Sequence, residues 1–149
     1  MSYQNITSAI QTCTITDENE FDLFVDEIIG QIDDIELSNA QKEELIGLFL
    51  AKIEDQPDPD FTSWSLIHFL DGLDEDNSTN YNDQVLQCLK RNPGYLTLLL
   101  ANRIANGLPK TSPDRLNFIS ALKDVALNPS VEEYLRKEAN ALYEYQLNK

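Results

Sequence analysis

Apolar residues recur every three or four positions along most of the chain, which is the pattern of amphipathic α-helices. Asp17 and Glu20 stand three residues apart, a spacing typical of the residues that cap the start of a helix. From Glu20 to Glu36 one apolar stripe contains Phe21, Phe24, Val25, Ile28, Ile32 and Ile35. The pattern therefore predicts a long helix over residues 20–36.

A second capping pattern, Ser38-Asn39-Ala40-Gln41, follows this helix. Helical spacing of apolar residues then continues through Leu45, Leu48, Phe49 and Ile53. Pro57 is expected to end this second long helix. The two long helices should form a hairpin. A short helix over residues 3–11 and a linker at residues 12–16 are expected before them.

Three prolines divide the rest of the chain at regular intervals. Asp58-Pro59, Asn92-Pro93 and Asn128-Pro129 each place a capping residue before a proline suited to the first position of a helix. The prolines are 34 and 36 residues apart, so that each interval can hold one helix pair. The pattern predicts that helices begin at these three points.

Apolar spacing within the intervals predicts further helices over residues 64–73, 81–89, 96–104 and 113–125 and from about Ser130. An acidic, polar loop is expected at residues 74–80. Asn106-Gly107 is typical of a helix end, and Ser112-Pro113 is typical of a helix start.

These elements predict an all-α fold of about seven helices, in a single domain that spans residues 1–149. A spacing of 34–36 residues between helix pairs is what stacked α-solenoid repeats show, although the intervals share little side-chain identity. Two architectures stay open: helical hairpins stacked as a short α-solenoid-like array, and an irregular helical bundle.

The charge of the chain is concentrated in one half. The 149 residues include 26 acidic and 11 basic side chains, for a net charge of −15. Residues 1–83 hold 20 of the acids and two bases, a net charge of −18, whereas residues 84–149 have a net charge of +3. A negative surface repels nucleic-acid phosphates and anionic lipids, which argues against both as direct ligands and favours a basic partner.

The cysteines and the N-terminal residues favour a cytoplasmic protein. Cys13 and Cys88 are far apart in sequence and lack the neighbours of a disulfide framework or a zinc site. The first residues lack the basic and apolar regions of a signal peptide, and no stretch reaches the roughly 20 apolar residues of a membrane span.

The chain offers little for catalysis. His68 is the only histidine, and the five glycines form no phosphate-binding loop or nucleophile elbow. A calcium loop counted from Asp74 would put Thr79 at the position of the required glycine and Val85 at that of the bidentate glutamate. We therefore expect no enzyme activity, no cofactor and no metal site, with an enzyme of unrecognised type as a remaining alternative.

Acidic residues on the first long helix recur opposite its apolar stripe. Like charges four residues apart cost roughly 0.2–0.5 kcal/mol each, but a patch of one sign speeds association with a basic partner by about 10–10³-fold. On the helix over residues 64–73, Trp64, His68 and Asp71 should lean toward one side. The predicted partner-binding residues are Asp22, Asp26, Asp33, Trp64, His68, Asp71, Asp74, Glu75 and Asp76.

The segment Trp64-Ser65-Leu66-Ile67-His68-Phe69-Leu70 and its acidic continuation, in a small, acidic, all-helical chain, resemble the helical immunity proteins of bacterial contact-dependent growth inhibition and other polymorphic-toxin systems. The resemblance implies a protein that binds the C-terminal toxin domain of a large effector in the cytosol of the producing bacterium. Such toxins are often basic nucleases that act on tRNA or DNA. The resemblance transfers no functional residue individually.

The main alternative is a helical-repeat adaptor or secretion chaperone. Such a protein would expose an apolar groove for a peptide segment, and its binding would respond little to salt.

Overall fold

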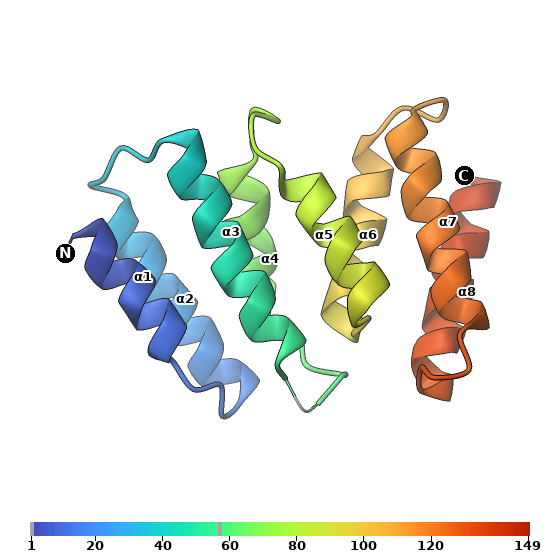
Figure 1. Cartoon of the computed structure of the whole chain (residues 1–149), viewed down its shortest axis with the longest axis horizontal. Coiled ribbons are helices and arrows are strands. Elements are labelled where there is room, and N and C mark those ends of the chain that lie inside the picture. The colour runs from blue at the N-terminus through green and yellow to red at the C-terminus, as the bar shows by residue number, and fades with distance from the viewer. Residues whose placement is uncertain (1, 57) are drawn as a thin grey trace. The chain divides into compact units, whose positions relative to one another are not determined.

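The chain folds into α-helices, as shown by a computed structural model that describes residues 2–56 and 58–149 (Figure 1). Over those residues it contains no strand, and its eight helices are α1 (Tyr3–Thr12), α2 (Glu18–Ile32), α3 (Asn39–Glu54), α4 (Trp64–Leu73), α5 (Tyr81–Arg91), α6 (Tyr95–Gly107), α7 (Pro113–Leu127) and α8 (Glu133–Asn148). The all-α prediction is confirmed, with one helix more than the expected seven. None of the described helices is long and apolar enough to cross a membrane.

Contacts divide the chain into two compact units, Met1–Gln84 and Val85–Lys149, called here the N-terminal unit and the C-terminal unit. The division falls within α5. It lies one residue beyond the point where the charge changes sign, so the N-terminal unit has a net charge of −18 and the C-terminal unit one of +3. The acidity of the chain thus belongs to one structural unit.

The N-terminal unit consists of two neighbouring helical hairpins (Figure 1). Helix α1 pairs with α2 and α3 pairs with α4, and across the hairpins α1 packs on α3 while α2 packs on α4. Helical repeats stack in this way, with the first helix of one hairpin on the first helix of the next and the second on the second. Within the N-terminal unit, the arrangement is the one expected of stacked hairpins.

Aromatic rings form the centre of the N-terminal unit. Phe21 of α2 lies edge-on to Phe49 of α3 and to Phe61, with ring centroids 6.3 and 5.6 Å apart. Phe49 in turn lies edge-on to Phe69 of α4, at 5.4 Å. All four rings are buried. Edge-to-face aromatic pairs add stability beyond their buried area, so this cluster holds three helices together.

Capping residues define several helix ends as predicted. Asp17 accepts a hydrogen bond from the Glu20 backbone amide at 2.8 Å, and Ser38 and Gln41 form the reciprocal capping box at the start of α3. Ser112 precedes α7 with Pro113 in its first turn. Helix α3 ends at Glu54, and Pro57, expected to end it, lies outside the described residues.

Helix α2 is shorter than predicted. It ends at Ile32, one turn before Glu36, with Asp33 as its C-cap. Adjacent carboxylates at Asp33 and Asp34 oppose the negative end of the helix dipole, and aspartate is a poor helix former, so continuation of the helix is unfavourable here.

The prediction that helices begin at three Asx-Pro pairs is wrong. Asp58 instead accepts hydrogen bonds from the backbone amides of Asp60 and Phe61 and so forms a turn. Asn128 makes the same turn with Ser130 and Val131. An Asx side chain that bonds two residues ahead mimics a backbone turn.

The helices begin two to five residues beyond these pairs. After Asp58-Pro59 the turn places Phe61 in the aromatic core before α4 begins at Trp64. Helix α6 begins at Tyr95 and not at Pro93, and α8 begins at Glu133 and not at about Ser130.

In the C-terminal unit, α6, α7 and α8 pack against one another, and a polar network centred on the buried Arg115 and Gln146 joins them. The Arg115 guanidinium, 6% exposed, donates to the backbone oxygen and to Oε1 of Gln146 at 2.8 and 3.1 Å. The Gln146 amide donates to Oδ1 of Asn102 and of Asn106, at 2.7 and 2.9 Å. Gln146 thus links α7 to α6 and supplies part of the solvation that a buried cation needs.

Replacing Gln146→Leu should therefore lower the free energy of unfolding by about 1–3 kcal/mol, because the buried guanidinium loses an acceptor and two asparagines lose a donor. Asn140→Leu on the exposed face of α8 is the control and should change it by less than about 0.5 kcal/mol. Denaturation followed by circular dichroism measures both. Equal effects of the two substitutions would contradict a stabilising role of the network.

Candidate functional site

The three predicted carboxylates of α2 have different surroundings. Asp26 and Asp33 are exposed, whereas Asp22 is half-buried and accepts a hydrogen bond from the Ser63 hydroxyl. Ser63 is itself buried and caps α4 by accepting from the Leu66 amide at 3.2 Å. Asp22 therefore joins α2 to the start of α4, while Asp26 and Asp33 face solvent.

Trp64 and His68 are neighbours on the surface of α4. Their ring centroids lie 6.3 Å apart with an angle of 33° between the planes, as the spacing of four residues allows. The Trp64 side chain is 53% exposed, which is unusual for the largest apolar residue of the unit. Asp71, one turn beyond His68, is half-buried and accepts a hydrogen bond from the Tyr81 hydroxyl at 3.5 Å.

The loop between α4 and α5 occupies residues 74–80, as predicted. Asp74 accepts hydrogen bonds from the amide and hydroxyl of Thr79, at 3.1 and 2.6 Å. Asp76 accepts from the amide and hydroxyl of Ser78, at 3.2 and 2.5 Å. Asn77 adopts a left-handed conformation between them, with φ of 56°. Two of the three predicted loop acids thus organise the loop, and Glu75 is exposed.

The loop is also attached to α3. The Ser78 hydroxyl bonds Oδ1 of Asn39 at 3.1 Å, and the Asn80 amide donates to Oε1 of Glu43 at 3.2 Å. Within residues 2–56 and 58–149, no group of three or more histidine, cysteine or acidic side chains is placed to hold a metal ion. Hydrogen bonds to Asp74 and Asp76 and to α3 thus hold the loop in place.

Hydrogen bonding changes the titration of Asp76. The Ser78 hydroxyl, which bonds the ionised carboxylate, holds the pKa of Asp76 below its ordinary value of 3.8, and the Ser78 amide and the charge of Lys42 act in the same direction. Asp76 therefore stays negative at any physiological pH.

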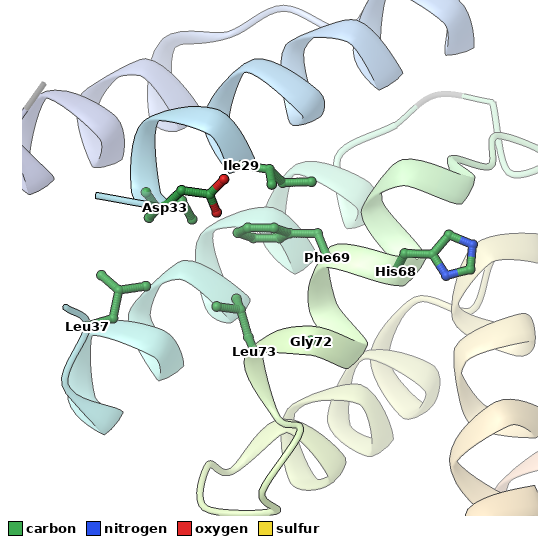
Figure 2. A pocket seen from close by; sticks show the side chains of 8 residues that line it. Ile29, Asp33, Leu37, His68, Phe69, Gly72 and Leu73 are labelled. Atoms are coloured by element: carbon green, nitrogen blue, oxygen red, sulfur yellow. The ribbon is translucent and has the colours of Figure 1, made fainter. Parts of the chain in front are cut away.

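A groove of about 360 Å³ lies between α2, α4 and the segment that follows α2 (Figure 2). Its lining is mostly apolar and consists of Ile29, Ile32, Leu37, Phe69, Gly72 and Leu73, with Asp33 and His68 as the polar members. Figure 2 shows the Asp33 carboxylate at the edge of the groove and the His68 imidazole turned away from it, on the other side of Phe69. This volume is at the lower end of the roughly 300–1,000 Å³ of ligand-binding pockets.

The structure brings together only part of the predicted site. Asp33 and His68 line the same groove, and Trp64 contacts His68. Asp22 lies instead at the start of α4, bonded to Ser63. The groove itself was not predicted, because Ile29 and Leu37 are apolar residues outside the α2 stripe whose spacing does not show that they line one pocket.

In comparisons with protein-family models, curated proteins and solved structures, nothing matches this chain. Its function must therefore be argued from its own residues.

If Asp22 joins α2 to α4, Asp22→Ala should lower the free energy of unfolding by about 1–3 kcal/mol, because the buried Ser63 hydroxyl loses its acceptor. Asp26→Ala removes the same charge from the same helix at an exposed position and should change it by less than about 0.5 kcal/mol. Denaturation followed by Trp64 fluorescence reports both. A loss of stability in both variants, or in neither, would contradict a structural role for Asp22 that Asp26 lacks.

The Asp76 carboxyl should titrate below pH 3.8 in the folded protein, as followed by NMR of the side-chain carbon. A carboxyl whose pKa is lowered on folding stabilises the fold above its unfolded pKa and loses this contribution as pH falls through its folded pKa. Ser78→Ala should raise the pKa toward 3.8. Thr79→Val removes a hydroxyl that bonds Asp74 instead, and should leave the Asp76 titration unchanged.

Proposed function

We propose that this chain is an immunity protein that binds and neutralises a basic toxin domain, of the nuclease class, in the cytosol of the bacterium that produces the toxin. The observation that supports this most is the net charge of −18 on the compact N-terminal unit. A surface of one sign attracts a partner of the opposite sign and raises the rate of encounter.

Both lysines of the N-terminal unit already interact with its own groups. The Lys52 ammonium donates to the backbone oxygens of Gln11 and Cys13, at 2.6 and 2.9 Å, and so caps the end of α1. Lys42 lies close enough to Asp76 for its charge to lower the pKa of that carboxyl. Exposed acids such as Asp26, Asp33 and Glu75 therefore remain for a cationic partner.

The chemistry of a nuclease fits such a surface. Its substrate groove is cationic because it binds phosphates, and carboxylates that pair with the same lysines and arginines would occupy it in place of substrate. Charge mainly sets the rate of association, whereas a central aromatic side chain contributes most to affinity. We assign that anchor to Trp64, which is half-exposed beside His68.

The alternative function is a helical-repeat adaptor or secretion chaperone that binds a peptide segment. The apolar groove between α2 and α4 and the hairpin stacking of the N-terminal unit favour it. Salt separates the two: peptide binding through apolar contacts changes little with ionic strength, whereas steering by charge weakens as salt screens it.

The test uses a basic C-terminal toxin domain encoded next to this chain. Co-expression should protect cells from the toxin, and the association rate of the purified pair should fall steeply with salt. Asp26→Lys with Asp33→Lys should slow association about tenfold or more. A control with the same change of charge, Asp124→Lys with Glu138→Lys, alters exposed acids of the C-terminal unit and should have a much smaller effect. A neighbouring basic toxin domain that is neither bound nor inhibited would overturn the proposal.

A further inference from the structure

The groove lies where two helices end. Its lining includes Ile32 and Asp33, at the end of α2, and Gly72 and Leu73, at the end of α4. At the opposite end of the pair, Asp22 of α2 bonds Ser63, which precedes α4. The two helices therefore run in the same direction, and their C-terminal ends converge on the groove.

This convergence places negative charge at the rim of the groove. A helix C-terminus carries about half a negative charge, which basic residues in the last turn usually offset. Neither α2 nor α4 has a basic residue in its last turn, and the C-cap residues are Asp33 and Asp74. The groove thus combines an apolar floor with a negative rim, and its lining contains no lysine or arginine.

A matching ligand has two features. It carries a large apolar side chain that removes the floor from water, and a lysine or arginine next to it that reaches the rim. Lysine and arginine fit such a border because their apolar stems lie along apolar surface while the charged end stays at the edge. The volume of about 360 Å³ accommodates side chains and not a whole folded element.

We propose that this groove binds a segment of a basic partner protein in which a large apolar side chain is flanked by lysine or arginine. The apolar side chain packs against Phe69 and Leu73. The cation pairs with Asp33, the C-cap of α2, where the ends of α2 and α4 converge. This deepens the proposed function, on which it rests for the basic nature of the partner.

Binding to the full chain is followed by the fluorescence anisotropy of a labelled peptide, since Trp64 contacts the His68 imidazole, which is turned away from the groove. The probe is a short synthetic peptide with two leucines between lysines. Its anisotropy should rise on binding. Replacing its leucines by alanine, or its lysines by glutamate, should each weaken binding roughly tenfold or more.

A glycine provides the blocking variant. Gly72 lines the groove and has open space where a side chain would begin, so a phenylalanine there fits without a clash and can cover the groove. Gly30 on the exposed side of α2 has the same open space but does not line the groove. Gly72→Phe should weaken peptide binding roughly tenfold or more, and Gly30→Phe by less than about twofold.

The charge of the rim is tested separately. Asp33→Lys should weaken binding of the lysine-flanked peptide more than Asp26→Lys, which changes the same charge two turns away on the same helix. Circular dichroism confirms that each variant is folded. Equal effects of the two substitutions would show that general surface charge is responsible, and would overturn the proposal.

Other outcomes are equally decisive. Peptide binding that Gly72→Phe leaves intact, or that survives the change from leucine to alanine, would overturn the groove as the site. Equal binding of the glutamate-flanked peptide would overturn the basic character of the occupant.

The groove and the proposed function can fail independently. Neutralisation of the toxin by the Gly72→Phe variant as well as by the natural chain would remove the groove from the interface and leave the function standing. If peptide binding depends on Gly72 but the chain neutralises no basic toxin, the proposal for the groove is kept and the proposed function is overturned.

Discussion

Repulsion between like charges constrains the N-terminal unit more than any other interaction, because 20 carboxylates and two lysines share 84 residues. Packing of uncharged groups must offset this repulsion. An aromatic cluster supplies this packing, because its edge-to-face contacts join α2, α3 and α4. The cluster consists of Phe21, Phe49, Phe61 and Phe69. Since repulsion acts over about a Debye length and packing acts only at contact, the core must be well filled for the acidic surface to exist.

The same constraint explains how the carboxylates are distributed. Asp22, Asp74 and Asp76 each accept hydrogen bonds from nearby serine or threonine residues, so their charges stabilise local structure. Asp26 on α2 and Asp33 at its C-cap, beside the groove, are exposed. The acidic residues of the N-terminal unit therefore fall into two groups. One group stabilises the fold of the unit, and the other is exposed and remains for a partner.

Local signals were enough to predict most of the fold. The all-α class, the capping box at Ser38, the start of α7 at Pro113 and the loop at residues 74–80 all follow from interactions within a few residues. The helix starts at the Asx-Pro pairs were wrong because the same residues cap helices and form turns, and burial of Phe61 selected the turn. The groove was not predictable, since it depends on how far apart α2 and α4 lie, which no spacing within either helix contains.

Because α2 and α4 run parallel, their helix dipoles point in the same direction. Their starts, capped by Asp17 and Ser63, form the positive ends of two aligned dipoles, and their ends at Asp33 and Asp74 form the negative ones. Because the dipole effect falls off within the first and last turns, an extended chain laid along the two helices would meet opposite partial charges at its two ends. Two sequences of identical composition, one the reverse of the other, would consequently differ in energy on this surface, so that the helix pair distinguishes polarity as well as charge.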